Sequence, residues 1–342
     1  MRKLRVLLLM HEDLIPPSSL EGHADEEMLE WKTEFDVLAT LENMGHDVHP
    51  LGVQNDLNPI RQTLEKYKPH IAFNLLEEFH SVAQYDQHVV SYLELMQQPY
   101  TGCNPRGLLL AHDKALCKKL LTFHRIPTPK FLEFPLDRSI KVPSRVKYPL
   151  LVKSVVDDAS LGISQASVVH NEEKLKERVR FIHENIKSDA LVEEYIEGRE
   201  FYVGVLGNHR LQTLPVWELK FTKADEDVPL IATRRVKWDL KYQKKLGVET
   251  MAAADLTPAM VSQFSRLSKR IYKILNLTGY ARMDFRMSED GKIYVLEANP
   301  NPNLSYGEDL AESAETVGIS YENLLQRIMN LGLRYRAAWQ TD

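Results

Sequence analysis

The first hundred residues alternate between apolar runs and amphipathic segments, and this alternation constrains the fold more than any other feature. Residues 5–10 form a dense apolar run bounded by polar residues, which is typical of a strand buried on both faces of a parallel sheet. A helical period follows over residues 32–44, and Gly45 can end that helix. Further strands are predicted at residues 46–52 and 70–76, with a helix at 60–67 between them. This order predicts an α/β fold that begins with a doubly wound domain.

The rest of the chain divides into further units. In the first unit, residues 16–30 are predicted to be a loop and residues 97–101 a strand, and Pro105 can open the following helix. A second unit is predicted from residue 113, with helices at 113–124 and 171–186, a strand–turn–strand at 149–164 and a strand at 190–195. A third unit from residue 200 is predicted to contain strands at 200–206, 281–287 and 292–297, a charged loop at 220–245 and a helix at 260–275.

Composition excludes several classes of protein. A chain of 342 residues has room for two or three domains, and its net charge of −5 gives no global attraction to nucleic acid or anionic lipid. Two cysteines exclude a disulfide scaffold and a cysteine-rich zinc site, and they fit a reducing compartment. The first apolar run is too short to span a bilayer, so we expect a cytoplasmic protein.

Four polar residues near the C-terminal end are the strongest candidates for a site. If residues 282–285 and 294–299 are paired strands, Arg282 and Asp284 share a face, and so do Glu297 and Asn299. Carboxylate and amide oxygens suit Mg²⁺, which shares its coordination with water and substrate phosphates. The alternative is a hairpin with a solvated polar face.

Two lysines lie in apolar surroundings. Lys114 begins a predicted helix, and Lys153 ends the run PLLVK. A lysine in a buried strand is costly unless an anion accompanies it, and a nucleotide phosphate is one such anion. The alternative for each residue alone is a lysine whose ammonium group reaches solvent.

Residues 281–305, ARMDFRMSEDGKIYVLEANPNPNLS, resemble the metal-binding end of the ATP-grasp superfamily, in particular the D-alanine–D-alanine ligase-like enzymes. The resemblance runs along most of the chain and is strongest from about residue 100 to residue 305. It implies an N-terminal pre-ATP-grasp domain over 1–112, a central lid subdomain over 113–199 and a C-terminal subdomain over 200–342. It also implies that Asp284, Glu297 and Asn299 hold two Mg²⁺ or Mn²⁺ ions, and that Arg282 faces the acyl phosphate.

The resemblance further implies an ATP site. Lys114 and Lys153 match lysines that contact phosphates. The loop DDASLG keeps the family's serine as Ser160 and its glycine as Gly162, has Asp157 in place of a glutamate, and departs from the family at Asp158 and Ala159. The expected catalytic residues are Arg282, Lys153 and Ser160. The stretch LVEEYIEGRE resembles an adenine and ribose clamp, and Lys241 matches a further phosphate-contacting lysine; the clamp residues are Glu193, Glu194, Tyr195, Ile196 and Glu200. The alternatives are an ordinary turn for the loop and solvated edge strands for the clamp.

The substrate side is matched less closely. The first loop is longer than in the family and lacks its paired glycines, and Glu26 is nearest to the glutamate that holds the first substrate's amine. His80 matches a substrate-side histidine, although a lone histidine is more often structural. Asn303 stands where the family has a glycine, and Glu308 where it has a serine that binds an acceptor carboxylate. Like-charge repulsion by Glu308 would favour a cationic acceptor over D-alanine, unless Glu308 points to solvent or pairs with a cation.

Together the residues and the resemblance predict an ATP-dependent carboxylate–amine ligase that forms an acyl phosphate and releases ADP and phosphate. The alternatives are an authentic D-alanine–D-alanine ligase and a nucleotide-binding regulatory protein without turnover. The expected partners are small-molecule carboxylates and amines, with neither nucleic acid nor membrane, and the resemblance allows a homodimer.

Overall fold

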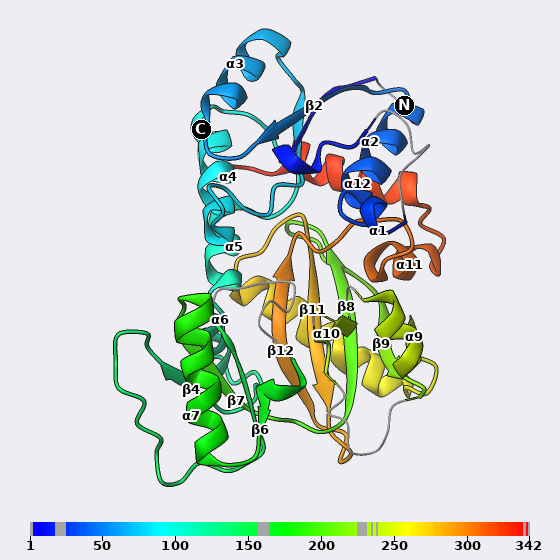
Figure 1. Ribbon diagram of the computed structural model, residues 1–342. Coiled ribbons are helices and arrows are strands. Elements are labelled where there is room, and N and C mark those ends of the chain that lie inside the picture. The colour runs from blue at the N-terminus through cyan, green and yellow to red at the C-terminus, as the bar shows by residue number, and fades with distance from the viewer. Residues whose placement is uncertain are drawn as a thin grey trace.

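The described residues form three β-sheets, which lie in successive stretches of the chain (Figure 1). The structure is a computed structural model that describes residues 3–17, 25–155, 164–223, 231–233, 235–236, 239–337 and 340. No helix in these ranges is long and apolar enough to cross a membrane.

The N-terminal sheet is parallel, with the order β2–β1–β3. Its strands are β1 (Arg5–His11), β2 (Asp47–Val53) and β3 (Ile71–Asn74). Leu7 and Leu9 of β1 enter one core and Leu8 enters another, because successive side chains point to opposite faces of a strand. Helices α3 (Asn58–Tyr67) and α4 (Asp86–Leu95) contribute to the first core, and α2 (Lys32–Asn43) and α12 (Tyr321–Arg334) to the second. The predicted doubly wound domain is confirmed, and it is completed by the C-terminal helix, red in Figure 1 beside α2.

The second sheet is antiparallel, with the order β4–β7–β5–β6. Its strands are β4 (Phe131–Phe134), β5 (Leu150–Ser154), β6 (Val168–Val169) and β7 (Ala190–Glu194). Helix α7 (Glu172–Phe181), extended by a π-helical turn over Ile182–Ile186, packs Leu175 and Val179 on this sheet.

The third sheet is also antiparallel, with the order β10–β9–β8–β11–β12. Its strands are β8 (Arg199–Leu206), β9 (Gln212–Phe221), β10 (Val248–Ala252), β11 (Tyr280–Met287) and β12 (Ile293–Pro300). Helix α10 (Pro258–Ile274) covers one face, where the ring of Phe264 lies 5.1 Å from that of Phe201 and 5.3 Å from that of Phe285. Since Phe285 points toward α10, its neighbour Asp284 points to the opposite face.

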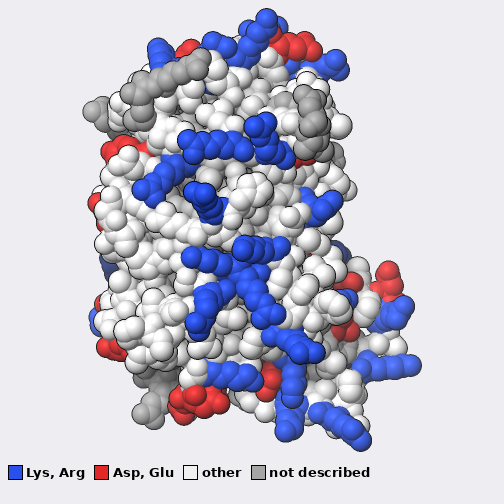
Figure 2. All heavy atoms as spheres, turned by 180° about the vertical axis from the view of Figure 1, so that it is seen from behind, with Lys and Arg blue, Asp and Glu red and all other residues white. Residues whose placement is uncertain are grey.

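The basic side chains are unevenly distributed. Figure 2 shows Lys and Arg gathered across the back of the molecule, the side on which α10 lies. Arg266, Arg270 and Lys273 of α10 are exposed, and the sequence has no Asp or Glu between Asp255 and Asp284. Asp284 and Glu297, which pair with each other, lie on the other face of the third sheet, whereas Glu218 pairs with Phe201 and shares the face that α10 covers.

The remaining helices in the described ranges connect these layers. They are α1 (Asp25–Met28), α5 (Pro105–His112), α6 (Lys114–Phe123), α9 (Leu240–Leu246), α11 (Asp309–Glu315) and three short 3₁₀ turns (Glu12–Leu14, Ala83–Tyr85 and Gln165–Ser167). Pro105 opens α5 as predicted, since Asn104 caps the helix by accepting from the backbone N–H of Gly107 at 3.0 Å.

Several predicted elements differ from the structure. Residues 97–101 form only an isolated bridge between Tyr100 and Ala72, because Gln97 has a φ of 55° and Pro99 has no N–H to donate. The predicted loop at 16–30 contains α1, and the predicted loop at 220–245 begins inside β9 and ends in α9, whose N-cap is Asp239. In the predicted strand–turn–strand, β5 is confirmed, β6 lies four residues beyond the predicted end, and residues 156–163 lie outside the described chain.

The domain boundaries at residues 112/113 and 199/200 stay a proposal. The three sheets fall close to these divisions, but α12 packs on the first sheet although it belongs to the last unit in sequence.

Candidate active site

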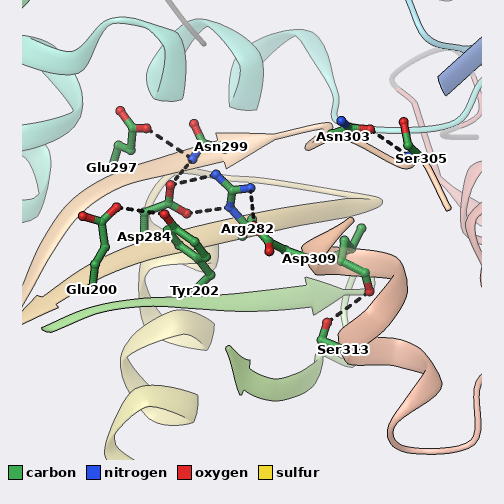
Figure 3. A network of polar contacts seen from close by, with 11 residues as sticks. Glu200, Tyr202, Arg282, Asp284, Glu297, Asn299, Asn303, Ser305, Asp309 and Ser313 are labelled. Atoms are coloured by element: carbon green, nitrogen blue, oxygen red, sulfur yellow. Dashed lines mark hydrogen bonds and ion pairs between the residues drawn. The ribbon is translucent and has the colours of Figure 1, made fainter. Parts of the chain in front are cut away.

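Four predicted residues meet on the face of the third sheet that α10 does not cover. Asp284 lies opposite Glu297 in the pairing of β11 with β12, and Arg282 lies opposite Asn299. The guanidinium of Arg282 donates to both carboxylate oxygens of Asp284, from Nε at 2.8 Å and from Nη2 at 2.9 Å. Asn299 Nδ2 donates to Asp284 Oδ2 at 2.9 Å and to Glu297 Oε1 at 3.5 Å (Figure 3). The structure therefore brings the predicted arginine and all three predicted metal ligands together.

Arg282 is held from three sides. Besides Asp284, its Nη1 lies 3.4 Å from Asp309 Oδ2, and its guanidinium lies 4.6 Å from the centre of the Tyr202 ring. Burial acts to lower the pKa of Arg282, but Asp284 and Asp309 outweigh it, so the pKa stays well above its ordinary value. The guanidinium is thus a fixed positive charge with a defined orientation.

The donor set fits a hard divalent cation. No cluster of three or more His, Cys, Asp or Glu side chains in the described ranges could hold a metal ion by itself. The candidate site instead combines the carboxylates of Asp284 and Glu297 with the amide of Asn299. If the Asn299 amide were turned by 180°, its oxygen would face the two carboxylates, where a cation could bind it. A carboxylate has about four acceptor positions, so Asp284 retains capacity beside the two bonds from Arg282. Such a set leaves the remaining coordination positions to water and phosphate oxygens, as Mg²⁺ requires.

The two predicted phosphate lysines are both buried. Lys153 lies in β5 with its Nζ 2.9 Å from Glu193 Oε1, so a protein carboxylate already supplies the anion that its burial requires. Lys114 begins α6, and its backbone N–H donates to Val155 O at 3.2 Å. Both lysines therefore lie near the end of β5, Lys153 within the strand and Lys114 at the start of α6.

The predicted adenine and ribose clamp follows β7 into β8. Glu193 is fully buried, Glu194 is half-buried, and the backbone N–H of Tyr195 donates to Pro149 O at 3.1 Å. The carbonyl of Ile196 accepts from Arg286 Nη1 at 3.4 Å. Part of the backbone proposed for the adenine edge is therefore already hydrogen-bonded within the protein.

Glu200 is buried in the same region. Tyr202 Oη donates to its Oε1 at 2.9 Å, and Arg286 forms an ion pair with its Oε2. Burial acts to lower the pKa of Arg286, whereas the charge of Glu200 raises it, with a net upward shift. Both oxygens of Glu200 therefore have a partner within the protein, Tyr202 for Oε1 and Arg286 for Oε2.

Two predicted residues do not join this network. Lys241 is exposed on α9. His80 is exposed in a tight turn with a φ of 57°, and its backbone N–H donates to Gln54 O at 2.6 Å. His80 therefore lies in a turn, which agrees with the alternative that this histidine has a structural role.

Some predicted residues cannot be placed. Asp157, Ser160 and Gly162 lie outside the described residues. Glu26 lies in α1, and its side chain is also outside the description.

The acceptor-side residues lie between β12 and α11. Asn303 Oδ1 accepts from Thr33 Oγ1 at 3.0 Å and from the backbone N–H of Ser305 at 2.7 Å, which ties this segment to α2. Glu308 is exposed at the start of α11, which agrees with the alternative that it points to solvent. The carboxylate near Arg282 is that of Asp309. The poorly hydrated surroundings expected for Glu308 are therefore not found.

Three buried residues of the site were not predicted from the sequence. Arg286 follows Arg282 at a spacing that keeps both on one face of β11, and Tyr202 lies opposite Asp284 on β8. Lys118 follows Lys114 by one helical turn, and its Nζ lies 3.3 Å from Glu193 Oε1. The i+4 spacing was the only signal for Lys118, and it is equally typical of a solvated helix face.

The second sheet beside a third sheet that carries this arginine, carboxylate and amide network is the arrangement of an ATP-grasp fold. Residues 120–330 match the protein family described as "D-ala D-ala ligase C-terminus". The uncharacterized protein y4sG of Sinorhizobium fredii is 30% identical over 306 residues, which cover 87% of this chain and 86% of that protein. The D-alanine–D-alanine ligase of Carboxydothermus hydrogenoformans is 29% identical over 323 residues, which cover 92% of this chain and 97% of that enzyme.

A solved structure supports the same fold. The D-alanine–D-alanine ligase of Bacillus anthracis complexed with ATP superposes with a TM-score of 0.75 over 97% of this chain and 98% of that one, at 22% identity. The chain belongs to the D-alanine–D-alanine ligase family. The predicted ATP-grasp fold and the predicted class, an ATP-dependent ligase that forms a C–N bond, are both confirmed.

Proposed function

We propose that this ligase joins a small-molecule carboxylate to an amine through an acyl phosphate, with Mg²⁺ bound by Asp284, Glu297 and Asn299. The observation that carries the proposal is the partly buried network in which Arg282 donates twice to Asp284 and Asn299 bridges Asp284 and Glu297. A purely structural hairpin does not require a guanidinium, two carboxylates and an amide on one face.

The chemistry has two steps. An oxygen of the donor carboxylate attacks the γ-phosphorus of ATP, so that an O–P bond forms while the bond to ADP breaks. The amine nitrogen then attacks the acyl carbon, a C–N bond forms, phosphate leaves and the amine loses a proton. Both steps bring anions together, and preorganised positive charge in a site of low polarity lowers their barriers.

The residues of this chain divide the task. Arg282, oriented by Asp284 and Asp309, supplies N–H donors where negative charge develops at the transferring centre. Lys114 and Lys153 bind the ground-state phosphates, and Glu200 accepts from the ribose. Bound Mg²⁺ would neutralise phosphate charge.

The donor and acceptor define the finer proposal. Relatives are named D-alanine–D-alanine ligases, so D-alanine is one candidate substrate for this chain. Because Glu308 is exposed, its repulsion of an acceptor carboxylate is no longer a reason to exclude D-alanine. A homodimer, a cytoplasmic location and the lack of a nucleic-acid partner stay predictions, as do the roles of Asp157, Ser160, Gly162, Lys241, Glu26 and His80.

The test is a screen for ADP formation that depends on added substrate. Amino acids including D-alanine, dipeptides and polyamines would be supplied singly and in pairs with ATP and Mg²⁺, and products identified by mass. We expect ADP release with one pair and a product lighter than the sum of that pair by one water. ATP binding without ADP release for any pair would favour the regulatory alternative.

A further inference from the structure

Lys118 makes contacts that the proposed reaction does not explain. It lies on α6 and is 2% exposed, and its Nζ lies 3.3 Å from Glu193 Oε1 in the second sheet. The same ammonium donates to the backbone carbonyl of Leu296 in the third sheet at 3.1 Å. One buried side chain therefore joins the two sheets that enclose the proposed nucleotide site.

The contact at Leu296 is made at a bulge. Asp284 pairs with Glu297 and Phe285 pairs with Val295, so Leu296 has no partner on β11. A bulge leaves a residue outside the ladder and redirects its neighbours. Lys118 binds the carbonyl at this irregularity, directly before the proposed metal ligand Glu297.

The second contact involves two lysines on one carboxylate. Glu193 is 1% exposed, and its Oε1 is within ion-pair distance of both Lys118 and Lys153, the latter at 2.9 Å. Burial lowers the pKa of Lys118, and the charge of Glu193 acts in the opposite direction. A buried carboxylate that loses its only cation is strongly destabilised. If Lys153 were the only cation beside Glu193, this cost would keep Lys153 at that carboxylate.

We infer that Lys118 is a positioning residue for nucleotide binding: it stays on Glu193 as a permanent counter-ion, and so frees Lys153 to move from Glu193 to a phosphate group. The inference rests on the proposed function, in which Lys153 binds phosphate. Lys118 itself touches neither the nucleotide nor the reacting atoms.

The inference is tested by comparing ligands with and without phosphate. Lys118→Met leaves Glu193 with Lys153 alone, so we expect ADP to bind at least about tenfold more weakly, whereas the affinity for adenosine changes by less than about threefold. Lys118→Gln keeps a donor for the carbonyl of Leu296 without the charge, and it should behave like Lys118→Met. Lys118→Arg should retain most of the affinity for ADP.

The matched control is the neighbouring lysine. Lys119 is exposed and pairs with Glu133 at 2.8 Å, so Lys119→Met should bind both ligands like the wild type. Adding Glu193→Gln to Lys118→Met removes the charge that holds Lys153, and should restore part of the affinity for ADP. Isothermal titration calorimetry measures each affinity, and circular dichroism confirms that each variant is folded.

Equal weakening of ADP and adenosine would overturn the inference, because it would show a merely structural role. Wild-type affinity for ADP in Lys118→Gln would overturn it as well. The proposed function fails in a different way, since the wild-type protein itself would then bind no ADP.

Discussion

Replacing Asp284 with asparagine should uncouple the arginine and the metal site in one step. Asparagine keeps the size of the side chain but removes the charge that faces Arg282 at 2.8 and 2.9 Å. Breaking a buried ion pair by changing one partner costs about 3–5 kcal/mol. Arg282 retains Asp309 at 3.4 Å and the ring of Tyr202 at 4.6 Å, so we expect the lower end, a loss of about 3 kcal/mol in the free energy of unfolding.

The same variant should also lose most of its catalytic activity. Loss of a charged ligand and of the orientation of Arg282 should reduce kcat by at least about 10²-fold, and Glu297→Gln should do the same. The assay is ADP release at saturating ATP and Mg²⁺, with urea denaturation for the free energy of unfolding. Asp290→Asn is the matched control, because Asp290 is exposed in the turn between β11 and β12 and should leave the rate unchanged. A rate above ~10% of wild type for Asp284→Asn, a loss under about 1.4 kcal/mol in barrier, would refute the metal assignment.

Three further predictions concern other residues. Lys153→Ala should raise the KM for ATP, because Lys153 binds ground-state phosphate, and Arg282→Ala should lower kcat, because Arg282 binds the transferring centre. Steady-state kinetics that show the reverse pattern would contradict this division of roles. Burial raises the pKa of Glu34 from 4.5 to about 7, so its protonated form is favoured in the folded state and stability falls as pH rises from 4.5 to 7. Urea denaturation should show that Glu34→Gln reduces this fall in the free energy of unfolding by about 3 kcal/mol, whereas Glu42→Gln, at an exposed position, should not. Equal pH profiles for the two variants would contradict the role of Glu34. Glu308→Ser should change acceptor preference less than about threefold, because solvent screens an exposed charge; a switch between cationic and anionic acceptors would restore the repulsion argument.

The face of the sheet that carries the candidate site could be predicted from local pattern. Residues two apart on a strand share a face, so Arg282 with Asp284 and Glu297 with Asn299 needed only the correct pairing of two adjacent strands. A short turn between β11 and β12 makes that pairing the simplest one. The resemblance then gave these residues a chemical role.

The rest depended on contacts between distant parts of the chain. Lys153 and Glu193 come from different strands. Lys118 contacts Glu193 of the second sheet and Leu296 of the third, which only the tertiary fold brings together. The bulge at Leu296 has no signature in an otherwise regular strand. Glu308 was placed by counting along a sequence, and such a count cannot show which side of a helix start faces solvent.

The central claim is ligation through an acyl phosphate, and oxygen transfer tests it most directly. The donor carboxylate found in the substrate screen would be labelled with ¹⁸O in both oxygens and supplied with ATP, Mg²⁺ and the acceptor amine. The account predicts that one ¹⁸O appears in each released phosphate and the other stays in the amide product, both measured by mass spectrometry. Release of phosphate without ¹⁸O while the amide forms would contradict the account.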